Sequence, residues 1–110
     1  MKIIYHKGLT EKKWFAKNIF EQMANVGSEV GRALNWQGKN PKDSQMAFER
    51  ALELLDITVA DPKNKSRLKE LLRLREALVD YFVFENEYSS TKNSWQNYFY
   101  AFNYAARLGL

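Results

Sequence analysis

In four successive segments of this chain the apolar side chains recur every three or four residues, and this spacing constrains the fold more than any other feature. The segments cover residues 11–37, 40–59, 63–84 and 91–108. A period of about 3.6 residues with one apolar face is typical of an amphipathic α-helix. The sequence therefore predicts an all-α protein with four helices.

Capping residues mark where these helices begin and end. Gly38 follows the first, Asn40 and Pro41 open the second, and Thr91 or Ser90 precedes the fourth. Asn, Ser and Thr side chains accept hydrogen bonds from the free N–H groups of a first turn, where Pro is also tolerated. The capping residues thus predict the same helix positions as the apolar period.

The connections between the predicted helices are short, which favours antiparallel neighbours. At 110 residues the chain is long enough for one domain with a modest core. We therefore expect an antiparallel up-down four-helix bundle over residues 10–110. Residues 1–9 are expected to form a short irregular arm in front of it.

Arg75 lies among apolar residues of the third predicted helix, namely Leu68, Leu71, Leu72, Leu78, Val79 and Phe82. A guanidinium keeps its charge, so burying it requires a carboxylate or several acceptors. Glu29, at the edge of the apolar face of the first helix, is the expected partner in a buried ion pair. Alternatively, this face of the helix opens to a ligand or to another subunit.

The chain has one histidine and no cysteine, which excludes several kinds of site. A di-iron bundle needs two histidines on helices, and the usual zinc sites need several His or Cys ligands. No glycine-rich phosphate loop is present. His6 falls in the arm, where we expect it to be exposed. We therefore expect no metal, no cofactor and no catalytic residue.

The beginning of the sequence lacks the apolar stretch of a signal peptide, and no run of 18 apolar residues occurs. The absence of cysteine is compatible with a reducing compartment. These features lead us to expect a cytoplasmic protein without a membrane segment.

The net charge of +4 is concentrated near the start of the third helix, since residues 62–76 carry six basic and two acidic side chains. Lys63, Lys65, Arg67 and Lys69 are candidates for an anion site, because the free N–H groups of a helix start also attract anions. The alternative is that these side chains are simply solvated. The same density of charge would permit contact with nucleic acid phosphates.

Aromatic residues make up 15% of the chain, and five residues are candidates for an interface. Trp14 and Trp36 flank a polar strip of the first helix, where they would line a groove. Tyr100, Tyr104 and Arg107 share the outer face of the fourth helix. Trp, Tyr and Arg anchor many protein interfaces, and Tyr and Arg also stack on bases.

Gly27 and Gly31 lie one turn apart within the first predicted helix. Each glycine weakens a helix by about 1 kcal/mol relative to alanine. A close approach of a second helix to this strip would offset that cost, and chance spacing is the alternative.

Four segments carry a resemblance: ANVGSEVGRALNW (24–36), AFERALELLD (47–56), RLKELLRLREALVDYF (67–82) and SWQNYFYAFNYAARL (94–108). Over most of its length the chain resembles a family of short, uncharacterised bacterial helical proteins. The resemblance implies a compact helical domain and no particular activity.

Three hypotheses about function follow. The first is a non-enzymatic helical module that forms a homo-oligomer or binds another protein. The second is a nucleic-acid-binding accessory protein that uses the basic start of the third helix and the Tyr/Arg face of the fourth. The third is an enzyme or small-ligand binder in which Glu29, Arg32, Arg75, Glu76 and Asp80 would have to converge.

Overall fold

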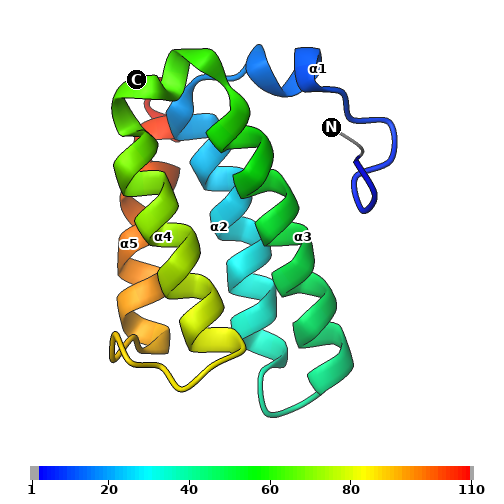
Figure 1. Ribbon diagram of the computed structural model, residues 1–110, viewed down its shortest axis with the longest axis vertical. Coiled ribbons are helices and arrows are strands. Elements are labelled where there is room, and N and C mark those ends of the chain that lie inside the picture. Colours follow the sequence, from blue (N-terminus) through cyan, green and yellow to red (C-terminus); the bar gives the residue numbers. More distant parts are fainter. Residues whose placement is uncertain (1–2, 110) are drawn as a thin grey trace.

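The computed structural model describes residues 3–109, and all regular structure in this range is helical (Figure 1). The elements are α1 (Glu11–Phe15), α2 (Ile19–Trp36), α3 (Pro41–Ala60), the 3-10 helix η1 (Pro62–Arg67), α4 (Leu68–Phe82) and α5 (Lys92–Arg107). The prediction of an all-α protein is confirmed. The described residues nevertheless contain five α-helices rather than the expected four.

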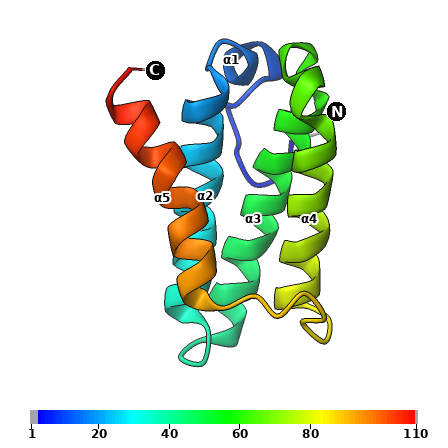
Figure 2. The same cartoon turned by 90° about the vertical axis from the view of Figure 1, so that its left-hand side faces the viewer.

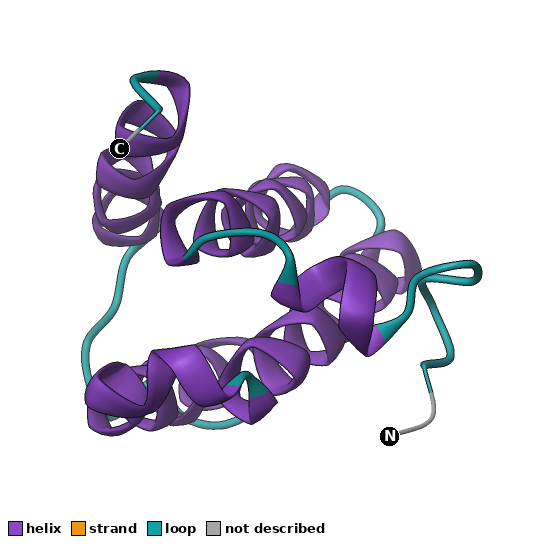
Figure 3. Cartoon of the chain, turned by 90° about the horizontal axis from the view of Figure 1, so that it is seen from above, coloured by secondary structure: helices purple, strands orange, loops and turns teal. Residues whose placement is uncertain are grey.

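The four long helices alternate in direction along the chain (Figure 1). In Figure 2, α5 and α2 lie towards one side of the molecule and α3 and α4 towards the other, and Figure 3 gives the view from above. Most helix-to-helix contact involves α2, which packs against both α3 and α5. Between α4 and α5 the contact is made by large side chains, such as Tyr81 and Trp95, whose ring centroids are 6.2 Å apart. The core includes the fully buried side chains of Met23, Val26, Val30, Leu55, Ile57, Leu71 and Leu78.

The first predicted helix is broken into α1 and α2, which corrects the expectation of a continuous helix over residues 11–37. Asn18 is the N-cap of α2 and accepts a hydrogen bond from the backbone N–H of Glu21 at 2.9 Å. The turn in the chain places Trp14 in the core, where its indole N–H donates to Thr58 Oγ1 at 3.0 Å. The break therefore exchanges a few helical hydrogen bonds for burial of a large aromatic side chain.

The third predicted helix is also divided, because residues 62–67 form η1 before α4 begins at Leu68. Asp61 caps η1 by accepting from the backbone N–H of Lys63 at 3.1 Å. The α-helix ends at Phe82 rather than at residue 84. In a segment of six residues, the apolar period cannot distinguish a 3-10 helix, which has three residues per turn, from an α-helix.

Two other helix starts agree with the sequence prediction. Asn40 caps α3, with Pro41 in its first turn. Thr91 caps α5 and exchanges hydrogen bonds with Ser94, at 3.0 Å and 2.9 Å. Reciprocal pairs of this kind satisfy two backbone donors within a single turn.

The described part of the arm, residues 3–9, lies against α3 of the same chain. The carboxylate of Glu53 accepts from the backbone N–H groups of Ile4, Tyr5 and His6 at 2.7–3.1 Å, and it lies 3.0 Å from His6 Nδ1. Burial raises the pKa of Glu53, but these hydrogen bonds outweigh burial and hold the pKa below its usual range. His6 is therefore a partly buried contact of the arm and not an exposed tail residue. Residues 1 and 2 lie outside the described range.

Gly27 allows α2 and α5 to come close together. A Cβ atom added to Gly27 would lie 2.7 Å from Cβ of Phe99, whereas one added to Gly31 would meet nothing within 4 Å. The structure thus gives a packing role to the first glycine of the strip and none to the second.

Candidate functional site

Arg75 lies at the edge of the apolar face of α4, and it is not buried. Its Nε donates to Asp56 Oδ1 at 2.7 Å, and both side chains are 40% exposed. The hydrogen bond and the charge of Asp56 raise the pKa of Arg75 against a smaller opposing effect of burial. The expected buried pair with Glu29 is therefore wrong. The apolar period identified the helix, but it could not show that the long side chain leaves the core on the side of α3.

We expect Arg75→Ala to lower the free energy of unfolding by less than about 1 kcal/mol, because ion pairs this exposed contribute little. A buried pair would have cost about 3–5 kcal/mol. Urea denaturation of both proteins measures the difference. Leu71→Ala, in the core one turn earlier, is the control and should cost about 2–5 kcal/mol. A loss as large for Arg75 as for Leu71 would contradict the exposed placement.

Glu29 is paired with Arg32 on the same helix, at 2.6 Å from Arg32 Nη1 to Glu29 Oε1. The second carboxylate oxygen of Glu29 is buried and has no hydrogen-bond partner. The indole nitrogen of Trp95 is likewise buried without a partner. Both groups cost stability unless something satisfies them.

The predicted groove between Trp14 and Trp36 does not exist. Trp14 belongs to α1 and is 2% exposed, so it cannot serve as an interface residue. Trp36, at the end of α2, is 44% exposed. The two residues face different surroundings because the chain turns between α1 and α2, which a wheel drawn for one helix cannot show.

Of the four anion-site candidates, Lys63 and Arg67 are engaged in contacts within the chain. Lys63 Nζ donates to the carbonyl of Phe15 at 2.7 Å and to Asp61. Arg67 lies 5.9 Å from the ring centroid of Phe20 and 3.8 Å from Glu70. Lys65 and Lys69 are exposed. Two of the four cations thus contribute to contacts within the chain, and the predicted helix start at residue 63 is a short 3-10 turn.

A buried polar cluster joins α1, α2, α3 and η1, and the sequence analysis missed it. Gln22 Nε2 donates to Asp61 Oδ2 at 2.8 Å and to the carbonyl of Trp14 at 3.1 Å. Asn64 Nδ2 donates to Gln22 Oε1 at 2.8 Å and to the carbonyl of Thr58 at 3.1 Å. These polar side chains are buried and hydrogen-bonded to each other, which gives the cluster a structural role. A signal was available, since Gln22 interrupts the apolar face of α2.

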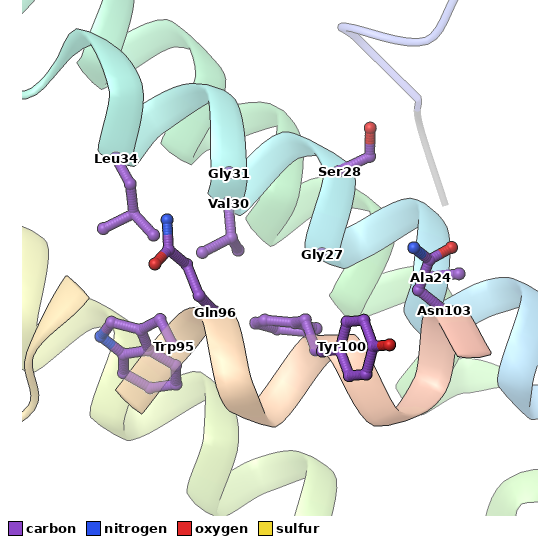
Figure 4. Close-up of a pocket in the computed structure, with 11 residues that line it drawn as sticks. Ala24, Gly27, Ser28, Val30, Gly31, Leu34, Trp95, Gln96, Tyr100 and Asn103 are labelled. Atoms are coloured by element: carbon purple, nitrogen blue, oxygen red, sulfur yellow. The ribbon is translucent and has the colours of Figure 1, made fainter. Parts of the chain in front are cut away.

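The outer face of α5 exposes aromatic side chains next to a pocket. Tyr100 and Tyr104 are 60% and 50% exposed, and their rings stack at 6.3 Å. Arg107 is exposed one turn further along. The pocket, of about 300 Å³, lies between α2 and α5 over Gly27 and Gly31 (Figure 4). In Figure 4 the indole nitrogen of Trp95 points away from this pocket, and the polar side chains in the lining are those of Ser28, Gln96, Tyr100 and Asn103.

A second set of exposed apolar side chains lies on α4 and on the residues that follow it. Leu72 and Phe84 are 48% and 70% exposed, and Leu68, Val83 and Tyr88 are also exposed. An open pocket of about 570 Å³ lies at the end of α4. Its lining comprises Leu72, Arg75, Glu76, Val79, Asp80, Phe84, Glu85, Glu87 and Tyr88.

Asp80 is the buried member of this lining. Its carboxylate accepts from the backbone N–H groups of Glu87 and Tyr88 at 2.8 Å and 3.1 Å, which holds the loop after α4 against the helix. The five residues of the enzyme hypothesis do not converge. Arg75, Glu76 and Asp80 line the α4 pocket, while Glu29 and Arg32 pair on α2.

A second groove runs between α4 and α5 and is lined in part by Lys69, Arg73 and Tyr98. The hydroxyl of Tyr98 lies 3.3 Å from Glu70 Oε1. Burial, together with the negative charge of Glu70, raises the pKa of Tyr98 well above its ordinary value. Tyr98 therefore stays neutral over the physiological range of pH.

Within residues 3–109, no group of three or more His, Cys, Asp or Glu side chains is placed to hold a metal ion. None of the helices in this range is long and apolar enough to cross a membrane.

Comparison with known proteins found no relative: no family model, no curated protein and no solved structure matches the chain.

Proposed function

We propose that this protein is a non-enzymatic helical module that acts by associating with a second protein chain, in the first instance with a copy of itself. The observation that carries the proposal is a set of exposed apolar side chains on α4 and on the residues that follow it, namely Leu68, Leu72, Val83, Phe84 and Tyr88. Of these, Leu72, Phe84 and Tyr88 line one pocket. Contiguous apolar surface on a protein of this size is typical of an interaction site.

The hydrogen bonding of the buried polar groups also supports a binding role over catalysis. Gln22, Asp61 and Asn64 are committed to contacts with one another and with the backbone. Catalytic acids, bases and nucleophiles instead need access to a substrate. The charged side chains of Arg75, Glu76, Glu85 and Glu87 line the same pocket as Leu72 and Phe84, an arrangement that resembles the rim of a protein interface.

Sedimentation velocity over a wide range of protein concentration tests the proposal. We expect the apparent mass to rise with concentration from that of the 12.9 kDa chain towards twice this value. Burial of the exposed leucine and aromatic side chains would supply the driving force, at about 25 cal/mol per Å² of apolar surface. An apparent mass that remains that of a single chain up to the highest attainable protein concentration would overturn the proposal.

One observation favours a second candidate, binding of single-stranded nucleic acid. Lys69 and Arg73 line the groove between α4 and α5 together with Tyr98, and cations next to an aromatic ring suit a phosphate backbone with its bases. Fluorescence anisotropy with a labelled oligonucleotide should then show binding that weakens steeply as salt is added. No binding at low salt would reject this candidate.

A further inference from the structure

We infer that the outer face of α4 binds the same face of a second copy, with the two helices antiparallel and related by a twofold axis. This inference rests on the proposed function and specifies its partner, surface and orientation. Three observations carry it: an apolar stripe along α4, opposite charges at the two ends of that stripe, and a register in which the two copies are complementary.

The stripe consists of residues that share one side of α4. Leu68 and Leu72 lie one turn apart, as do Val79 and Val83, with Arg75 and Glu76 between the two pairs and Val83 directly after the last residue of α4. The four apolar side chains therefore fall along one side of the helix. Leu68, Leu72 and Val83 are exposed, and Val79 is partly exposed. The face of α4 that meets the core is a different one, formed by Leu71, Leu74 and Leu78. Val79 also packs partly against the core, whereas Leu68, Leu72 and Val83 add apolar surface that is not used in folding.

The charges at the two ends of the stripe have opposite sign. Lys65 and Lys69 are exposed at its beginning, and Glu85 and Glu87 are exposed at its end. A parallel pair of copies would place lysine against lysine and glutamate against glutamate. An antiparallel pair places the basic end of each copy over the acidic end of the other, which attracts at both ends. The charge distribution therefore selects both the partner and its direction.

In one register of the antiparallel pair, the residues in the middle of the stripe are also complementary between the two copies. If Arg75 of one copy lies opposite Glu76 of the other, the antiparallel arrangement places Leu72 opposite Val79 and Leu68 opposite Val83. Every contact then occurs twice, as a twofold interface requires. A guanidinium has five N–H donors, and the bonds to Asp56 are made from Nε and Nη2. Arg75 can thus keep Asp56 and still donate to a second carboxylate.

Charge reversal at the two ends tests the inference on exposed residues only. One variant carries Lys65→Glu with Lys69→Glu, so both ends of its stripe are acidic. The other carries Glu85→Lys with Glu87→Lys, so both ends are basic. For each variant alone, we expect the dissociation constant of the pair to be about tenfold or more above that of the wild type, because like charges now face each other.

Two further samples should restore association. A mixture of the acidic and basic variants pairs unlike ends again, and a chain with all four substitutions pairs with its own copy. Sedimentation velocity at low salt measures all of these species. In a parallel pair, like charges would face each other in the wild type as well as in both variants. A dissociation constant that is lower for the wild type than for both variants is therefore specific to an antiparallel pair.

Lys39→Glu with Lys42→Glu is the matched control for the acidic variant, since it makes the same change in net charge on two exposed residues, one just before α3 and one in its first turn. It should keep the mass of the wild type. Leu72→Gln tests the centre of the stripe without altering charge, and it should dissociate the pair. Circular dichroism checks that every variant keeps its helices.

Each outcome separates the inference from the proposed function. If the wild type, both charge variants and Leu72→Gln all associate equally well, the α4 arrangement is wrong, but self-association is still supported. A wild type that stays monomeric would overturn both. Variants that dissociate, together with a mixture and a fourfold variant that both fail to re-associate, would overturn the antiparallel charge pairing.

Discussion

Gly27→Ala should lower the free energy of unfolding by about 2–3 kcal/mol, although alanine favours a helix over glycine. The added methyl group would lie 2.7 Å from Cβ of Phe99 and 2.8 Å from two atoms of its ring. Because Cβ of Phe99 is fixed to the backbone of α5, a rotamer change cannot relieve the contact. The two helices must move apart, and the packing of Phe99 in the core is lost.

Gly31→Ala is the matched control, one turn further along α2. A Cβ at this position meets nothing within 4 Å. The substitution should raise the free energy of unfolding by up to about 1 kcal/mol through helix propensity alone. Thermal and urea denaturation of the two variants compare them with the wild type. Equal effects of the two substitutions would show that α2 and α5 do not pack as closely as the structure has them.

Asp61→Asn should cost about 3 kcal/mol, because it replaces a buried acceptor by a group that is half donor. The carboxylate of Asp61 accepts from Gln22 Nε2 and from the backbone N–H of Lys63. Gln22 cannot turn its amide to compensate, since its oxygen accepts from Asn64 Nδ2. One buried N–H group is therefore left facing another donor.

Asp56→Asn provides the control for this prediction, because it makes the same chemical change in a half-exposed ion pair with Arg75. It should cost less than about 1 kcal/mol. Urea denaturation at neutral pH gives both values. A cost for Asp61→Asn as small as that for Asp56→Asn would mean that the buried cluster does not hold the ends of these helices together.

The pH dependence of stability offers an independent measurement on Asp61. Burial raises the pKa of its carboxyl group, but hydrogen bonds from Lys63 and Gln22 outweigh burial and lower the pKa below the ordinary value of 3.8. The stabilisation is therefore complete above that ordinary value and is lost as the pH falls through the lower pKa of the folded state. Asp61→Asn should lose less stability than the wild type on acidification. Some acid sensitivity should remain, because the pKa values of Glu49 and Glu53 are also lowered.

The candidate surfaces could be predicted only in part. Tyr100, Tyr104 and Arg107 lie exposed on α5, where the sequence placed them. For the face of α4 around Arg75, the sequence left two alternatives open, a buried ion pair or a face that opens to a ligand or another subunit, and Leu68 and Leu72 are exposed. A helix with apolar residues on more than one side has two faces that could be buried, and the sequence does not say which one meets the rest of the chain.

The sequence by itself determined the helical class and two of the helix starts, at Asn40 and Thr91. These features depend on interactions within one or two turns, namely the apolar period and the cap, so they can be read locally. Only the tertiary structure decided the turn between α1 and α2, the burial of Trp14 and the partner of Arg75. Those outcomes depend on Thr58 and Asp56, which are distant in sequence from Trp14 and Arg75. Contacts between helices determine which hydrogen-bond partner a side chain has and whether it is buried, and these contacts cannot be read from one helix.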